Sequence, residues 1–158
     1  MTTRKDLSSF FRELNEVGKE HYNKNLTLEN HVKLPDPYSL TTDWCNDPSK
    51  LPDVSFADIY MYLIHTPSEF THEKLKAHKS LEAYNFFICG HVQNVGLREV
   101  KNRRYYFLRS SVLPSQRQGQ KEALYEVWIA LHEKGWILTG NCTCPSGYVI
   151  ASLWYIIK

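Results

Sequence analysis

The sequence has no apolar run approaching the roughly 18 residues that a membrane-spanning helix needs, so we expect no membrane partner. Its opening segment, MTTRKDLSSFFREL, has neither an apolar stretch nor a small-residue cleavage site, so it does not predict a secretory signal peptide. Cysteine is scarce, with 4 among 158 residues. Without a secretory signal we expect an intracellular location, cytoplasmic or nuclear, where thiols serve as metal ligands or core residues rather than disulfides.

The common catalytic motifs are also missing. The sequence contains no glycine-rich phosphate loop, no nucleophile elbow and no His-Glu-x-x-His helix, and its acidic residues are not grouped as paired catalytic carboxylates. A thiol enzyme built on Cys89, or on a redox pair of Cys142 and Cys144, would need a base or an orienting group, and the sequence shows none. We therefore predict that this chain is not an enzyme.

What is present is typical of one folded domain, since 42% of the residues are hydrophobic and 13% are aromatic. Residues 1–28 predict an N-terminal helix that Gly18 would end, with one apolar stripe: Leu7, Phe10, Phe11, Leu14 and Val17. Residues 29–53 contain four prolines and several turn-forming acids, which interrupt regular structure. We expect an extended proline-containing arm here, anchored by Tyr38 and Trp44, and the main boundary of the chain.

Residues 54–158 predict a helical pair followed by strands. Ser55 and Asp58 form a capping pair for a first helix, and a second helix is expected to begin at Pro67 or Thr71. Four runs rich in β-branched and aromatic residues predict strands: 85–95, 103–113, 124–131 and 135–142. Helices followed by a small antiparallel sheet, its last two strands joined by a tight hairpin, make an α+β fold.

Cys142 and Cys144 lie at the end of the last predicted strand. In an extended chain, residues i and i+2 point to the same side, so both sulfurs can face one ion. Pro145, Ser146 and Gly147 then turn the chain, as a metal knuckle requires in order to bring later ligands round. The pattern therefore predicts half of a zinc-finger knuckle, and its alternative is two thiols at a strand end that bind nothing.

Four stretches resemble SWIM-type zinc-finger proteins, above all an uncharacterised animal group: LPDVSFADIYMYLI, LKAHKSLEAYNFF, SSVLPSQRQ and GWILTGNCTCPSG. The resemblance spans about residues 50 to 147. It implies Zn²⁺ as the cofactor and DNA or a protein as the partner. In many proteins of that group the finger precedes a nuclease domain resembling phage recombination exonucleases, so the resemblance also implies a nuclease domain in the same or a longer gene product.

The SWIM pattern is Cys-x-Cys, a spacer and then Cys-x-His, and only Cys142 and Cys144 match it. The tail YVIASLWYIIK has neither Cys nor His, so the finger resembles a C-terminally truncated one with an incomplete zinc site. Codons for residues 147–149 can contain GTATGT, a splice-donor sequence, so we expect the genomic sequence to continue with Cys-x-His in frame. The CGH run at 89–91 is another source of ligands, unless Cys89 is a small buried residue with His91 as its polar neighbour.

A basic stretch between Arg98 and Lys121 carries seven positive residues and one acid, a net charge of +6 against +2 for the whole chain. Tyr105, Tyr106 and Phe107 lie inside it, and cations with stackable rings are what phosphate contact and base stacking require. A solvated strand face with aromatics turned inward fits the alternation as well. The candidate nucleic-acid-binding residues are Arg98, Lys101, Arg103, Arg104, Arg109, Arg117 and Lys121.

Two functions follow as hypotheses. The first is a zinc-binding SWIM-type module that mediates DNA or protein interaction and is not itself catalytic. The second is a degenerate protein-interaction domain that binds no metal. Zinc stoichiometry would separate the two, since only the first requires an ion.

Overall fold

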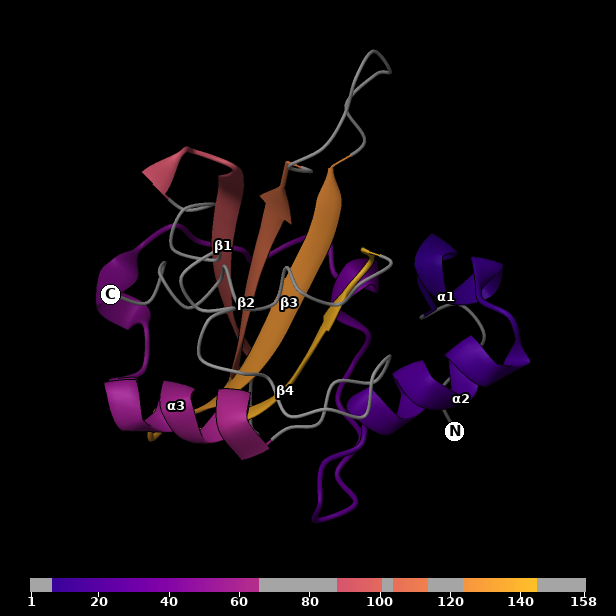
Figure 1. The fold of residues 1–158 in the computed structure, drawn as a ribbon, viewed down its shortest axis with the longest axis horizontal. Coiled ribbons are helices and arrows are strands. Elements are labelled where there is room, and N and C mark those ends of the chain that lie inside the picture. Colours follow the sequence, from indigo (N-terminus) through magenta and orange to yellow (C-terminus); the bar gives the residue numbers. More distant parts are fainter. Residues whose placement is uncertain (1–6, 66–87, 101–103, 114–123, 145–158) are drawn as a thin grey trace. The chain divides into compact units, whose positions relative to one another are not determined.

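A computed structural model describes residues 7–65, 88–100, 104–113 and 124–144 of the chain. These residues form two compact units, Met1–Trp44 and Cys45–Lys158. Among the described residues, the first unit contains two short α-helices, and the second contains one α-helix and a four-stranded antiparallel sheet (Figure 1). The predicted α+β fold is confirmed. The second predicted helix, from Pro67 or Thr71, falls outside the described residues.

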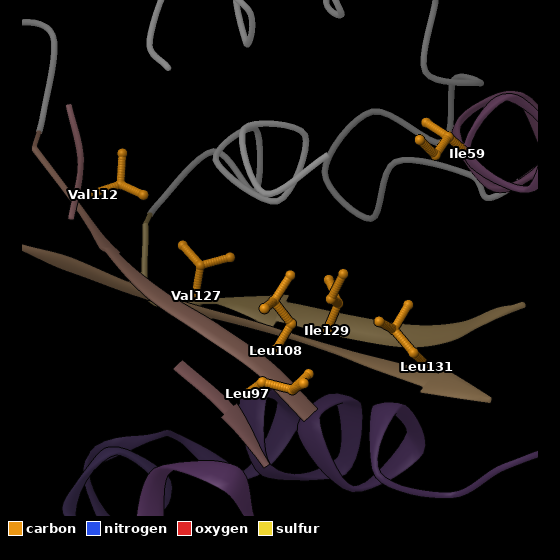
Figure 2. Packing of buried hydrophobic residues seen from close by; sticks show 7 residues of the cluster. All are labelled: Ile59, Leu97, Leu108, Val112, Val127, Ile129 and Leu131. Atoms are coloured by element: carbon orange, nitrogen blue, oxygen red, sulfur yellow. The ribbon is translucent and has the colours of Figure 1, made fainter. Parts of the chain in front are cut away.

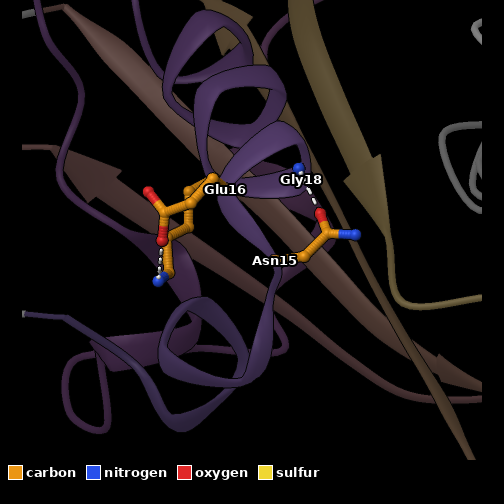
Figure 3. Close-up of polar contacts among 4 residues, drawn as sticks. Asn15, Glu16 and Gly18 are labelled. Carbon is orange, nitrogen blue, oxygen red and sulfur yellow. Dashed lines mark hydrogen bonds and ion pairs between the residues drawn. The ribbon is translucent and has the colours of Figure 1, made fainter.

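The N-terminal unit begins with two helices rather than the single predicted one. Helix α1 spans Ser9–Glu13 and α2 spans Glu16–Asn25, so Gly18 lies inside α2 and does not end a helix. The break arises because the Asn15 side chain accepts a hydrogen bond from the Gly18 N–H at 2.8 Å and caps α2 (Figure 3). Val17 consequently leaves the predicted apolar stripe, and its side chain is 75% exposed.

A buried carboxylate organises the rest of this unit. Asp36 accepts hydrogen bonds from the Ser8 N–H at 3.0 Å, the Tyr22 hydroxyl at 2.7 Å and the Tyr38 N–H at 3.0 Å. The ring of Phe10 contacts those of both tyrosines edge to face, and the two tyrosine rings stack with centroids 6.0 Å apart. Three segments of the chain therefore meet at one buried acidic side chain.

The segment predicted as an extended arm contains regular turns. Two 3-10 helices, η2 at Pro37–Ser39 and η3 at Pro48–Lys50, each follow an aspartate whose side chain accepts the N–H two residues ahead. Tyr38 does anchor this segment, through its stacking on Tyr22. The boundary between the units lies at 44/45, inside the segment where the sequence places it.

The second unit opens with helix α3, Phe56–His65. Its predicted capping pair is confirmed, since the Asp58 N–H donates to Ser55 Oγ at 3.2 Å and the Ser55 N–H donates to Asp58 Oδ2 at 2.9 Å. The four strands follow in chain order as β1 at Val92–Val100, β2 at Tyr105–Val112, β3 at Tyr125–His132 and β4 at Ile137–Cys142. All neighbours are antiparallel, and β1 begins later along the chain than predicted.

One face of the sheet forms the core of this unit. Val127 and Ile129 on β3 lie beside Leu108 and Val112 on β2, and Ile59 of α3 packs with them (Figure 2). Burying each of these side chains contributes about 1.5–3 kcal/mol. Because these apolar strand residues alternate along each strand, they all lie on one face of the sheet, and their burial together stabilises it.

Two glycines are required where elements approach closely. A methyl group on Gly140 of β4 would lie 2.9 Å from Ile129 Cγ2 and 3.0 Å from the Trp128 carbonyl oxygen. In the β3–β4 turn, Gly135 has φ +87°, and a methyl group there would clash with the Asp53 carbonyl oxygen. These contacts fix how β4 and its turn pack, and thereby fix the position of the cysteines at the end of β4.

Candidate metal knuckle and basic strand face

Cys142 and Cys144 sit at and just beyond the end of β4. Cys142 pairs with Val127 across the β3–β4 ladder, and its half-buried side chain packs against the core cluster. The chain bends immediately afterwards, and the Cys144 N–H donates to Cys142 Sγ with a nitrogen–sulfur distance of 3.0 Å. The segment therefore curls around one sulfur, rather than continuing as the straight strand from which the i, i+2 argument starts.

Thr143 attaches this bend to the neighbouring strand. Its N–H donates to the Glu126 carbonyl oxygen at 3.0 Å, and its hydroxyl oxygen accepts the Glu126 N–H at 3.0 Å. Both bonds are made at the start of β3, so they extend the ladder by one residue past Cys142. The bend is therefore held in place by the β3–β4 ladder before it and by the two Thr143 hydrogen bonds within it.

Chemically, the pair fits two of the four ligands of a structural zinc site. Such sites are tetrahedral, closed to solvent and rich in thiolate, and Cys144 is 5% exposed while Cys142 is half-buried. Hydrogen bonds to ligand atoms orient them and are typical of the layer around a bound metal, and the Cys144 N–H is a hydrogen-bond donor to Cys142 Sγ. None of the four cysteines, all of which are described, forms a disulfide.

The other half of such a site does not come from the described part of the chain. Within residues 7–65, 88–100, 104–113 and 124–144, no group of three or more His, Cys, Asp or Glu side chains is placed to hold a metal ion. The CGH run at 89–91 precedes β1, at the opposite edge of the sheet from β4. Three strand spacings of about 4.8 Å separate these edges, roughly 14 Å in all, so this alternative is wrong.

Cys89 also differs from its predicted environment. It is exposed, in the turn before β1, and is not a small buried residue. His91 is half-buried, and its Nδ1 lies 3.2 Å from the Leu113 carbonyl oxygen. The CGH run thus lies where the chain enters β1, and it supplies no ligand to the pair of Cys142 and Cys144.

The basic stretch is described only in part, since four of its seven cations fall outside the described residues: Lys101, Arg103, Arg117 and Lys121. Arg98 on β1 and Arg109 on β2 are half-buried, and the β1–β2 register puts them diagonally on the sheet face opposite the core. Desolvation lowers the pKa of Arg109, the nearby Glu126 carboxylate raises it, and Arg98 lowers it. The guanidinium stays protonated at neutral pH.

The rings within this stretch lie mostly inside the fold. Phe107 is fully buried and packs edge to face on Trp128 with ring centroids 5.8 Å apart, while Tyr106 packs against the core cluster. Base stacking needs exposed ring faces, so Phe107 cannot supply it here. The inward-facing alternative holds for Tyr106 but not for Phe107, because Phe107 is buried on the same sheet face as Arg98 and Arg109. Tyr105 is the half-buried ring that remains at the start of β2.

An exposed aromatic group lies next to Tyr105, at the end of the sheet that carries the β3–β4 turn. The His132 ring contacts Tyr105 with centroids 5.9 Å apart and stacks on Trp136 with centroids 4.9 Å apart and planes 19° from parallel. Sequence reasoning treated the segment HEKGW only as a hairpin turn. The signal that could have found the group is a tryptophan directly after the turn, where no core position is available to it.

No family model, curated protein or solved structure matches this chain. The SWIM resemblance therefore stays a prediction made from sequence motifs. In the part of the chain that the structure describes, no helix has the length and apolar character to cross a membrane.

Proposed function

We propose that this chain belongs to a zinc-binding interaction module of the SWIM type, in which Cys142 and Cys144 supply two of the four ligands. The remaining ligands would come from residues outside the described ranges, from a longer gene product or from a partner molecule. The module acts by binding DNA or a protein, not by catalysis. A nuclease domain in the same or a longer gene product is the proposed neighbour.

One observation carries this proposal: the Cys144 N–H donates to Cys142 Sγ at 3.0 Å within a closed bend at the end of a hairpin. A chance pair of strand-end thiols has no need of this arrangement, because a neutral thiol is a weak hydrogen-bond acceptor. A zinc-bound thiolate gains from it, since the donor stabilises negative charge on sulfur and fixes the ligand direction.

The second candidate function, a protein-interaction domain without a metal, is favoured by a different observation. Cys144 is buried at 5% exposure, and in the described residues no third ligand joins the pair. Buried cysteine packs as a small apolar side chain. Under this hypothesis the two cysteines contribute packing alone, and serine or alanine at either position would affect stability without affecting any metal.

Zinc content measured by elemental analysis separates the two functions. The full chain, and a version extended by its genomic continuation, would be purified in zinc and dialysed before measurement. We expect zinc bound at one ion per chain in the extended version, and bound more weakly in the chain as given, because two ligands supply only part of the roughly 10–16 kcal/mol of a complete site.

The matched control uses Cys89, an exposed thiol remote from the pair. Cys142→Ser combined with Cys144→Ser should abolish zinc binding, whereas Cys89→Ser should leave it unchanged, since Cys89 lies at the far edge of the sheet. Zinc retained by the double variant, or absent from both wild-type versions, would overturn the proposal. The second result would support the metal-free alternative.

A further inference from the structure

The aromatic group beside the β3–β4 turn shares this end of the sheet with two basic side chains. Together these residues, which we name the Trp136 platform, are Arg104, Tyr105, His132, Lys134 and Trp136. Trp136 is 52% exposed even though the His132 ring covers one of its faces. The Lys134 ammonium lies 5.6 Å from the centroid of the Trp136 ring, within cation–π range.

Backbone contacts hold the platform in place. The His132 N–H donates to the Trp136 carbonyl oxygen at 2.8 Å, and the Lys134 N–H donates to His132 Nδ1 at 3.2 Å, which fixes the ring that stacks on the tryptophan. Gly135 closes the turn between them with φ +87° and an N–H donated to the His132 carbonyl oxygen at 2.9 Å. The stacked pair is thus built into the hairpin and does not depend on a flexible side chain alone.

Arg104 is fixed at the same end of the sheet by two contacts with Glu133. Its carbonyl oxygen accepts the Glu133 N–H at 3.0 Å, and its guanidinium lies 3.3 Å from the Glu133 carboxylate. The Arg104 side chain is nevertheless 76% exposed. Because a guanidinium has five N–H donors, one ion pair leaves others directed to solvent.

We propose that the Trp136 platform binds single-stranded nucleic acid, with a base stacked on Trp136 and phosphates contacted by Lys134 and Arg104. This inference rests on the proposed function in so far as it names the partner of the module. Its support is complementarity, because single-strand binders combine aromatic faces that stack bases with cations that track the backbone. The platform offers both within one turn, whereas the rings inside the basic stretch are largely buried.

The charge balance favours a nucleic acid over an apolar protein surface. Lys134 lies over the Trp136 ring, and Arg104 pairs with Glu133, the acid of the same turn. Binding to an apolar partner would remove water from both cations without giving them an ionic partner, and this desolvation costs free energy. A phosphate backbone pairs with them.

The test measures binding of a fluorescent oligodeoxythymidine of about 16 nucleotides to the full chain by anisotropy at several salt concentrations. Trp136→Ala should weaken binding about 5- to 150-fold, the loss expected from one stacked base. Lys134→Ala should reduce the dependence of log affinity on log salt by about 0.7, which is the slope for one single-strand phosphate contact. Trp136→Phe, which keeps a stacking face, should recover part of the affinity.

Met61→Ala is the matched control, because Met61 on α3 is exposed to a similar extent, 54%. It should bind as the wild type does. Wild-type binding that Trp136→Ala leaves unchanged overturns the proposal, as does an absence of oligonucleotide binding, which would point to a protein partner. Repeating the titration with the Cys142→Ser, Cys144→Ser variant separates the two proposals: zinc retained by this variant would overturn the zinc function, whereas Trp136-dependent oligonucleotide binding by the same variant would support the platform on its own.

Discussion

Replacing Gly140 with alanine would test how closely β4 packs on β3, the contact that positions the knuckle. The added methyl group would meet Ile129 Cγ2 at 2.9 Å and the Trp128 carbonyl oxygen at 3.0 Å, both distances shorter than van der Waals contact. Ile129 and Trp128 are fully buried, so neither can move into solvent. Overpacking of this kind costs about 1–3 kcal/mol.

The stabilising effect of alanine on the unfolded chain opposes this overpacking but is smaller. Gly140 does not have a positive φ, and a glycine-to-alanine change that fits its site stabilises a protein by about 0.4–1 kcal/mol through the unfolded chain. The net expectation is a loss of about 1–2 kcal/mol, which for a chain of this length lowers Tm by about 2–8 °C. Thermal unfolding followed by circular dichroism measures it.

Whether Gly140→Ala lowers or raises Tm tests how tightly β4 packs on β3. If the contact were loose, the alanine would be accommodated and only the unfolded-state term would remain. A variant that melts at or above the wild-type temperature would therefore refute the close packing of β4 on β3, and with it the reason that Cys142 is held where the bend begins.

Two further substitutions test the rest of the fold. Asp36→Ala should destabilise the N-terminal unit by about 3 kcal/mol, because it leaves buried donors, among them the Tyr22 hydroxyl, without their acceptor. Amide hydrogen exchange in residues 7–40 should become faster, and unchanged exchange would contradict the prediction. Gly135→Ala should cost about 3 kcal/mol, since it combines a left-handed backbone with a methyl group that clashes with the Asp53 carbonyl oxygen. A urea midpoint equal to that of the wild type would count against this contact.

Much of the fold could be predicted from local patterns. The capping pair Ser55 and Asp58 marks the start of α3, and alternating β-branched and aromatic residues mark three of the four strands closely. The helix break at Asn15 could not be read from the apolar stripe, because capping by Asn15 competes with helix continuation and only tertiary packing decides between them. The stripe at Leu7 to Val17 is compatible with either outcome.

The candidate site shows a similar division. The closeness of Cys142 and Cys144 in space follows from their spacing in the sequence, but the bend that brings the Cys144 N–H to a sulfur depends on Thr143 bonding to β3. The Trp136 platform could not be predicted because it depends on register: Tyr105 lies opposite His132 only once β2 and β3 are paired. Sequence spacing carries no information about that juxtaposition.

Zinc K-edge X-ray absorption on the metal-loaded chain tests the central claim most directly, because it counts the sulfur atoms bound to the ion. The account predicts two sulfur ligands at about 2.3 Å, and their loss when Cys142 and Cys144 are both replaced by serine. A zinc shell made only of nitrogen and oxygen, or a sulfur signal that survives the double replacement, would contradict it.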